Sequence, residues 1–349
     1  MASLTRQLIS LLTLFAFTGF SSATAANFDW LFPIPWTSAF TSAPNPPQSF
    51  DVHDHFSAVT LNDSGIGLMD RAGGLPSPIV AAPDGVMSYQ ASYPQGSFKP
   101  SGPAPGGFGF YFGGPKNFSF ENADEILVSY AVYFPDNFDW WLGGKLPGPF
   151  GGTSQQQARA CSGGRQEDRD KCFSMRLMWR EHGDGEIYLY APKTVQNNVS
   201  AERLAGTVFE DDFGISVARG AFQFTAGAWT TVAQRVRLND IGQTNGEIEL
   251  WTNGKSVIHA TGLEIRVHPE TTFRGVHAQT FFGGNTSDWA TPVDQKTYFA
   301  HFSGAVVPQG ASPADGQAAY PLSSAQHLWS NPVRALIGTA LTALLFILV

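Results

Sequence analysis

The feature that most constrains this chain is a series of short apolar runs separated by glycine and proline, with no long stretch of helical periodicity. The 349 residues include 37 Gly and 23 Pro, which favour turns over helix interiors. The run ILVSYAVYF after Glu125 is β-branched and aromatic and stops at Pro135, as expected for a buried strand. We therefore predict an all-β protein with one domain, a jelly-roll sandwich of two antiparallel sheets.

The C-terminal half supplies further strands. AWTTVAQRVRLN and GEIELWTNGKSVI are interpreted as two strands joined by a loop that contains Asn245-Gly246, a strong hairpin signal. GVHAQTFFGG and KTYFAHFSGAVV are two more. The aromatic and Pro-rich stretch at residues 28–50 is expected to be irregular and to pack against the core, and helical periodicity is limited to a turn or two around residues 201–205.

Both ends of the chain have the composition of targeting signals. Residues 1–25 contain Arg6, an apolar run and then small residues, the layout of a secretory signal peptide; the run is short for a membrane anchor. Residues 311–334 form a Ser/Ala/Pro-rich stalk before an apolar tail at 335–349, which is typical of a GPI-anchor signal whose tail is removed. A short transmembrane tail is the alternative. We expect a secreted or cell-surface protein whose folded domain is residues 26–310.

Two further features agree with export. N-glycosylation triplets occur at Asn62, Asn117, Asn198 and Asn285. The only cysteines, Cys161 and Cys172, would close a short loop as a disulfide in an oxidising compartment. Two cysteines without a nearby histidine pair do not suggest a metal site, and we expect a monomer that needs no metal and no cofactor.

A candidate site lies within residues 143–192. Side chains two apart in a strand share a face. The run FSMRLMWR therefore presents Ser174, Arg176, Met178 and Arg180 together, and GEIYLYAP presents Glu186, Tyr188 and Tyr190. With Glu186 opposite Arg180 across the loop EHGDG, Arg176 faces Tyr190 and the polar set lines one open face. Such residues can be simple cross-strand stabilisers, but the preceding rigid Gly/Pro loop GGKLPGPFGG adds Lys145 to them.

This set suits chemistry on an anionic sugar polymer. The net charge of −8 argues against nucleic acid, so attraction to an acidic polysaccharide must be local. β-Elimination from a uronic acid needs cations to hold the carboxylate, a base for the C5 proton and an acid for the departing O4. Tyrosine can serve as either, with a pKa that nearby positive charge would lower.

The joint occurrence of KLPG, CFSMRLMW, GEIYLYAP, AQRVRLN and HAQTFFGG over residues 110–302 resembles polysaccharide lyase family 14. That family contains alginate and glucuronan lyases with a β-jelly-roll fold. The resemblance implies a catalytic set of Lys145, Ser174, Arg176, Tyr188 and Tyr190, with the base and acid roles of the two tyrosines left open. His277 and Gln279 share a strand face and are candidates for substrate binding, although a lone strand histidine is more often structural.

Two other functions remain possible from the sequence. A glycoside hydrolase needs two carboxylates, and Glu247 and Glu249 are the best pair available. Alternating glutamates on a strand, however, usually just form the polar face that the strand exposes to solvent. A non-catalytic carbohydrate-binding module would keep the fold and the aromatic residues. Phe281, Phe282, Trp140 and Trp141 could stack on sugars, but large aromatic residues in a sandwich belong by default to the core.

Overall fold

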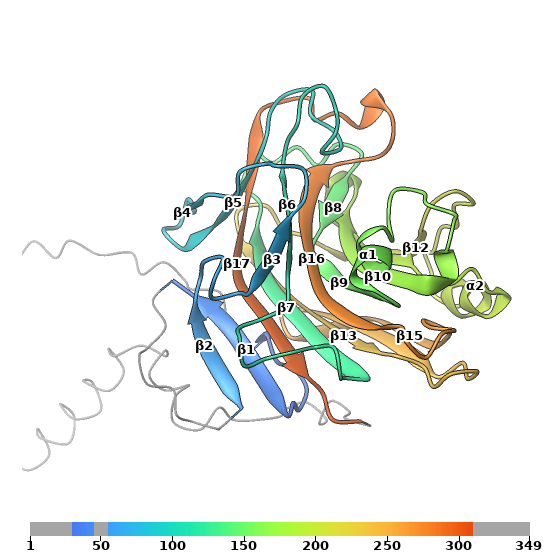
Figure 1. Cartoon of the computed structure of the whole chain (residues 1–349). Helices are drawn as coiled ribbons and strands as arrows, with labels where there is room; N and C mark the ends of the chain where they lie inside the picture. Colours follow the sequence, from blue (N-terminus) through green and yellow to red (C-terminus); the bar gives the residue numbers. More distant parts are fainter. Residues whose placement is uncertain (1–29, 45–54, 310–349) are drawn as a thin grey trace, which may run out of the picture.

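Two large β-sheets pack face to face in the computed structural model, which describes residues 30–44 and 55–309 (Figure 1). The first, sheet A, has the strand order β15-β14-β13-β7-β17-β1-β2, with β5 pairing β17 and β4 pairing β5. Its strands are β1 (Ser38–Ala43), β2 (Phe56–Thr60), β4 (Ile79–Ala81), β5 (Met87–Tyr93), β7 (Glu125–Tyr133), β13 (Trp229–Arg237), β14 (Gly246–Thr252), β15 (Lys255–Leu263) and β17 (Gln295–Val306).

The second sheet, sheet B, has the order β12-β11-β10-β8-β16-β6-β3, and β9 pairs with β10 and β16. Its strands are β3 (Leu68–Arg71), β6 (Phe108–Phe112), β8 (Gly144–Leu146), β9 (Gly148–Gly152), β10 (Cys172–Trp179), β11 (Asp184–Tyr190), β12 (Ile215–Gln223) and β16 (Thr272–Phe282). The helices are α1 (Gln155–Arg159) and α2 (Val195–Glu202), with 3₁₀ turns η2 (Arg169–Lys171), η3 (Glu181–Gly183) and η4 (Ser287–Trp289).

The core lies between the sheets and follows the two-residue period of the strands. Met175, Leu177 and Trp179 of β10 are buried together with Val128 and Tyr130 of β7. The alternate residues of β10 point to the other side of sheet B, away from this core. The predicted jelly-roll sandwich is confirmed, and the alternation determines which face of sheet B carries the polar residues.

The N-terminal stretch differs from the expectation. It was predicted to be irregular, but Ser38–Ala43 forms β1 inside sheet A, antiparallel to β17 and parallel to β2. The β1–β2 pair is thus a parallel edge on an otherwise antiparallel sheet. The described residues before β1 do pack on the protein: Phe32 and Trp36 lie with Phe56 against a small cluster on the outer side of sheet A. The sequence SAFTSA lacks a run of β-branched residues, so its strand depends on tertiary pairing.

Two turns also differ from the sequence interpretation. The predicted hairpin of β13 and β14 forms, but its connection is longer than a two-residue turn, and the Asn245 side chain hydrogen-bonds with Asp240 in it. The two-residue turn is Asn253-Gly254, with φ of 50° and 77°, and it divides GEIELWTNGKSVI into β14 and β15. Both residues adopt the left-handed region that this hairpin turn requires. The helix predicted near 201–205 lies earlier, at Val195–Glu202.

The predicted signal peptide at 1–25, the stalk at 311–334 and the apolar tail at 335–349 lie outside the described residues and remain predictions. Within the residues that the structure describes, no helix is long and apolar enough to cross a membrane.

Candidate active site

The predicted site residues lie on the face of sheet B that points away from the core. Lys145 comes from β8, Ser174 and Arg176 from β10, Tyr188 and Tyr190 from β11, and His277 and Gln279 from β16. Residues with the other parity on these strands, such as Leu177, Leu189 and Ala278, belong to the core. The structure therefore brings all seven predicted residues to one surface of one sheet.

The register of the β10–β11 hairpin differs from the prediction by two residues. Ser174 pairs with Tyr190, Arg176 with Tyr188 and Met178 with Glu186. The connecting turn is tighter than the loop that was assumed, because Arg180 N–H donates to the carbonyl oxygen of Asp184 (2.7 Å). A shift of two residues keeps every side chain on its predicted face. It changes which tyrosine pairs with Arg176 across the two strands, which is Tyr188 and not Tyr190.

Lys145 occupies the centre of the site. On either side of it, β8 pairs Lys145 with Met178 of β10 and with Phe281 of β16. Its Nζ lies 2.9 Å from Met178 Sδ and 4.2 Å from the centre of the Tyr188 ring. No carboxylate among the described residues forms an ion pair with it. Burial, and then the charges of Arg180 and Arg176, hold the pKa of Lys145 well below its usual range.

Arg176 is held in place by a residue of β16, which is separated from β10 by β8 and β9. Its Nη1 donates to Gln279 Oε1 at 2.6 Å, while the guanidinium itself is buried. A buried cation is costly unless an anion is close, and Gln279 is neutral. The arrangement therefore leaves positive charge available for an anionic ligand.

His277 and Tyr111 extend this row across the sheet. Tyr111 of β6 is directly opposite His277, and the two rings stack with their centres 4.3 Å apart. Burial, and then the charge of Arg176, keep the pKa of His277 well below its usual range, so the imidazole is neutral. Tyr111 was not among the predicted site residues. It lies in the Gly-dense stretch SGPAPGGFGFYFGGP beside other aromatic residues, and nothing in the sequence distinguishes it from them.

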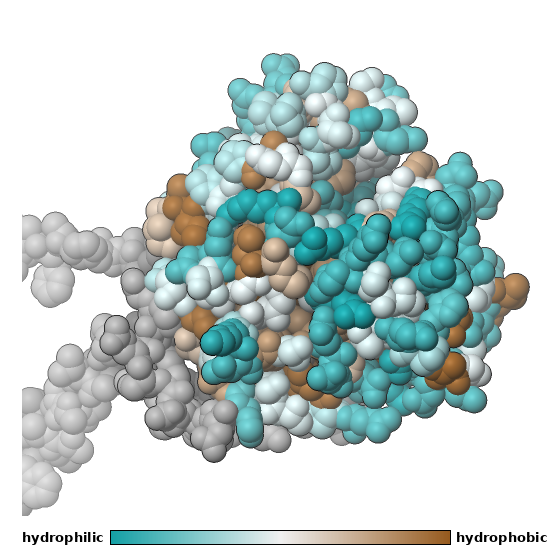
Figure 2. Space-filling model, in the orientation of Figure 1, coloured by the Kyte–Doolittle hydropathy of each residue, from teal (hydrophilic) through white to brown (hydrophobic). Residues whose placement is uncertain are grey.

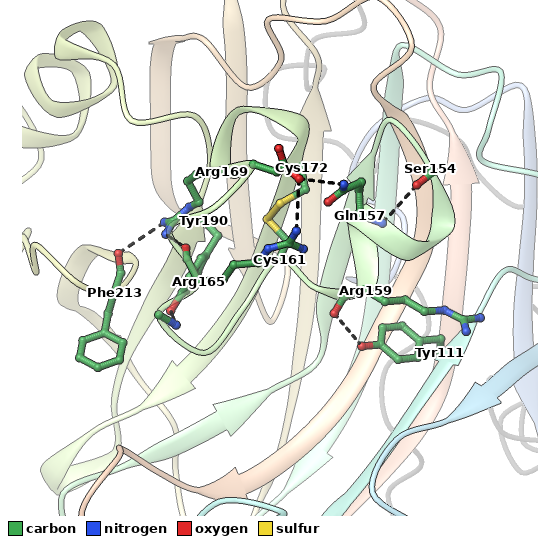
Figure 3. The surroundings of a disulfide bond; sticks show 12 residues. Tyr111, Ser154, Gln157, Arg159, Cys161, Arg165, Arg169, Cys172, Tyr190 and Phe213 are labelled. Atoms are coloured by element: carbon green, nitrogen blue, oxygen red, sulfur yellow. Dashed lines mark hydrogen bonds and ion pairs between the residues drawn. A yellow bond between two sulfur atoms is a disulfide. The ribbon is translucent and has the colours of Figure 1, made fainter.

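Two segments cover the tyrosines, and Figure 3 shows one of them, the loop closed by the Cys161–Cys172 disulfide. Arg169 of this loop lies over Tyr190, with its guanidinium carbon 4.1 Å from the ring centre, and Gly164 N–H donates to the Tyr190 hydroxyl oxygen (3.2 Å). The second covering segment is the one that leads into β12, and in it Gly214 N–H donates to the Tyr188 hydroxyl oxygen (3.3 Å). The predicted disulfide is confirmed, and its loop contributes to the site.

The site is less open than predicted. Tyr190 is 1% exposed and Lys145 8%, because the covering segments and the neighbouring side chains shield them. The charge of Arg176 does act to lower the pKa of Tyr188, as expected, but burial, followed by the effect of Tyr190, outweighs it and raises that pKa. Lys145 lies over the face of the Tyr188 ring.

Several buried polar atoms on this face have no hydrogen-bond partner among the described residues. They include Ser174 Oγ, Arg176 Nε and His277 Nε2. Buried donors without partners are unfavourable unless a ligand or water satisfies them. Their concentration around Lys145 indicates a binding site for a ligand rich in oxygen acceptors. In Figure 2 the surface over α1 and the adjacent part of β10 is mostly hydrophilic.

The pair of carboxylates considered for a hydrolase lies elsewhere. Glu247 and Glu249 belong to β14 of sheet A and both form ion pairs with Arg235, at 3.1 and 3.7 Å. Glu249 also accepts a hydrogen bond from Ser256 (2.7 Å) and is buried, contrary to the expected solvent-facing position. These contacts give the two glutamates a structural role.

The four aromatic candidates divide into two groups. Phe282 is buried in the core and Trp140 packs against it, as the default interpretation predicted. Phe281 lies on the polar face beside Lys145 and is only partly buried, and Trp141 is 42% exposed. Phe281 and Trp141 therefore remain candidates for contact with a ligand.

Comparisons with known proteins agree with this geometry. The family model Polysaccharide lyase 14 matches residues 82–302, which is more than half of the chain. A PL-14 alginate lyase from Aplysia kurodai has 29% sequence identity and a TM-score of 0.64, with 78% of this chain and 99% of that chain covered. An alginate lyase from Chlorella virus has 25% identity and a TM-score of 0.55, with 66% and 88% covered. No curated protein gives a significant match.

Proposed function

The chain belongs to the polysaccharide lyase 14 family, and from this premise we propose that it cleaves a uronic-acid polymer, of the alginate or glucuronan type, by β-elimination. The observation that carries the proposal is the group of buried donors and cations at Lys145, Ser174 and Arg176, none of which forms an ion pair or hydrogen bond with a carboxylate among the described residues. Such a group is suited to a substrate carboxylate. The similarity to two alginate lyases supports alginate as the first polymer to test.

In the proposed reaction, Lys145 and Arg176 bind the carboxylate of the sugar that loses its proton. Their positive charge stabilises the negative charge that develops when the C5–H bond breaks. Ser174, whose hydroxyl has no partner among the described residues, orients the same group. Gln279 fixes the Arg176 guanidinium, and His277 contributes a neutral ring nitrogen to the substrate.

We assign the proton transfers to the two tyrosines. Tyr190 has the Arg169 guanidinium over its ring and a backbone N–H that donates to its hydroxyl oxygen, and it serves as the base at C5. Tyr188, whose pKa burial raises, retains its proton and serves as the acid at O4. The C5–H and C4–O4 bonds break, a C4=C5 double bond forms, and O4 takes up a proton.

The proposal is tested with a panel of polymers. Alginate, polymannuronate, polyguluronate and glucuronan are each incubated with the protein, and ultraviolet absorbance of the unsaturated product is followed together with new reducing ends. A rise of both on at least one polymer is expected. Reducing ends without absorbance would identify a hydrolase, and binding without either would identify a carbohydrate-binding module.

We also propose that the protein is exported, acts as a monomer and is held at the cell surface by a GPI anchor. Support comes from exposed side chains at all four glycosylation triplets, Asn62, Asn117, Asn198 and Asn285, and from the disulfide. An endoglycosidase should increase the electrophoretic mobility of the native protein, and a phosphatidylinositol-specific phospholipase should release it from cells.

A further inference from the structure

Arg180 extends the cationic row of β10 beyond the proposed catalytic group. It follows Trp179, the last residue of β10, and has the same parity as Ser174, Arg176 and Met178. Residues two apart in a strand are about 6–7 Å apart along it. Arg180 therefore lies one such spacing beyond Met178, the residue that pairs with Lys145. A polymer bound at Lys145 that continues along β10 in this direction reaches Arg180 next.

A buried carboxylate fixes the position of Arg180. Glu186 is 0% exposed and accepts from Arg180 Nη2 at 2.6 Å and from Arg219 Nε at 2.8 Å. Ser216 Oγ donates to the same carboxylate (2.9 Å) and accepts from Arg180 Nη2 (3.0 Å). The single negative charge of Glu186 is thus paired with two positively charged arginines, and a net positive charge remains after both ion pairs form.

The free side of Arg180 faces an aromatic wall. Its guanidinium carbon is 5.6 Å from the centre of the Trp289 ring, while Arg180 Nε is buried without a partner among the described residues. A Cβ added at Gly284 would come within 2.2 Å of the Trp289 ring, so this glycine is required to seat the tryptophan. The donor and the ring together form a site for a group with a carboxylate and an apolar surface, as a uronic acid has.

Trp141 joins this wall to the Lys145 strand. Its indole N–H donates to the carbonyl oxygen of Asp288 (2.7 Å), and Gly283 N–H donates to the carbonyl oxygen of Gly143 (3.1 Å). Trp141 has a φ of 44°, in the left-handed region that bulky residues rarely adopt. An exposed tryptophan held in such a conformation next to a site is a functional candidate.

From these contacts we propose that Arg180, with Trp289 and Trp141 as its wall, binds the carboxylate of the uronic acid next to the one held by Lys145 and Arg176. This inference rests on the proposed function and adds a second carboxylate subsite to it. The enzyme should then bind a substrate with consecutive uronic acids more tightly than one that ends at the Lys145 subsite.

The test compares Arg180→Gln with Arg180→Lys and with the control Arg219→Gln, which removes the other arginine from the same Glu186 carboxylate. KM and kcat are measured on the polymer that the wild type cleaves best and on its shortest cleaved oligomer. Arg180→Gln should raise KM for the polymer by about tenfold to a hundredfold, the loss of one charged hydrogen-bonding group, with kcat nearly retained. Arg180→Lys should restore part of this loss. Arg219→Gln, which removes an equal charge from the same carboxylate, should raise KM by much less than Arg180→Gln.

Two results would overturn the subsite: an unchanged polymer KM in a folded Arg180→Gln protein, or an equal rise in Arg219→Gln, which would trace the effect to Glu186. Binding separates this failure from failure of the proposed function. If the wild type produces no unsaturated product, the function is wrong. The dissociation constant of the polyuronate for Lys145→Met, compared with Lys145→Met/Arg180→Gln, still reports on Arg180, and equal constants would reject the subsite.

Discussion

At the scale of single residues, Lys145 illustrates the conflict between binding and stability. Its ammonium group is buried beside Met178 and the Tyr188 ring, and its nearest charged influences, Arg180 and Arg176, are also positive. A charge in such surroundings loses hydration without gaining an ion pair. Lys145 is thus unfavourable for folding, yet it lies near donors that have no partner among the described residues. Binding of an anion explains why a lysine occupies this position.

Lys145→Met should therefore abolish the lyase activity and increase stability. Methionine fills a similar volume without the charge, and we expect the free energy of unfolding at neutral pH to rise by about 1–3 kcal/mol. The gain should shrink as the pH approaches 10.5, the ordinary pKa of lysine, because folded Lys145 releases its proton first and its penalty then disappears. Urea denaturation at several pH values measures this. A variant less stable than the wild type throughout would show that Lys145 is a structural residue.

At the scale of elements, the loop of residues 161–172 connects the disulfide to the tyrosines. It supplies both the Arg169 guanidinium over Tyr190 and the Gly164 N–H on its hydroxyl. Arg169 also donates to the carbonyl oxygens of Arg165 and Phe213, which links the loop to the second covering segment. The conformation of one short loop thus controls the surroundings of the proposed base.

Replacing both cysteines by serine should lower kcat while the protein stays folded. A disulfide that closes a loop of this length contributes about 3 kcal/mol on the chain-entropy model, and the core between the sheets does not depend on it. We expect at least a tenfold loss of kcat with cooperative thermal unfolding retained, as followed by circular dichroism. Loss of the folded state at room temperature, or wild-type kcat in the double variant, would contradict this role for the loop.

The sequence predicted the faces of the strands better than their registers. Parity alone placed Arg176, Tyr188 and Tyr190 on one side, because a two-residue period survives any even shift. The actual pairs depend on the turn, where His182 adopts a φ of 60° and shortens the loop in a way that EHGDG does not reveal. Both β1 and Tyr111 were missed for a related reason, since their neighbours in space are distant in sequence.

The resemblance to a known family also had limits that the structure makes clear. It pointed to Lys145 and the tyrosines, but it gave no role to the buried Glu186 or to Arg180. These residues act through contacts between β10, β11 and β12, with Ser216 and Arg219 coming from β12. A linear motif on one strand does not identify its partners on another.

At the scale of the whole molecule, two buried histidines link stability to pH. Burial, and then Arg176, keep the pKa of His277 well below its ordinary value of 6.5, and burial lowers the pKa of His301 on β17 to about 4. In the folded protein both rings stay neutral as the pH falls below 6.5, whereas in the unfolded chain both take up a proton. Stability is therefore lost with decreasing pH over this range.

His277→Gln should reduce this loss. Each histidine contributes up to about 1.4 kcal/mol per pH unit to the slope of the unfolding free energy. Urea denaturation between pH 6.5 and 4.5 should show that the unfolding free energy of the variant falls less steeply with decreasing pH than that of the wild type. The difference corresponds to up to one fewer proton taken up on unfolding, whatever the absolute stability of the variant. An identical slope in the two proteins would mean that His277 titrates alike in the folded and unfolded states.

The central claim is that the polar face of sheet B catalyses elimination, and the masses of the products test it most directly. The oligosaccharides released from the best polymer by the wild type, Lys145→Met and Tyr190→Phe are analysed by mass spectrometry. The wild type should release fragments whose new ends are one water lighter than hydrolysis products, and the two variants should release almost none at equal protein concentration. Fragments that retain the water, or full activity in both folded variants, would contradict the account.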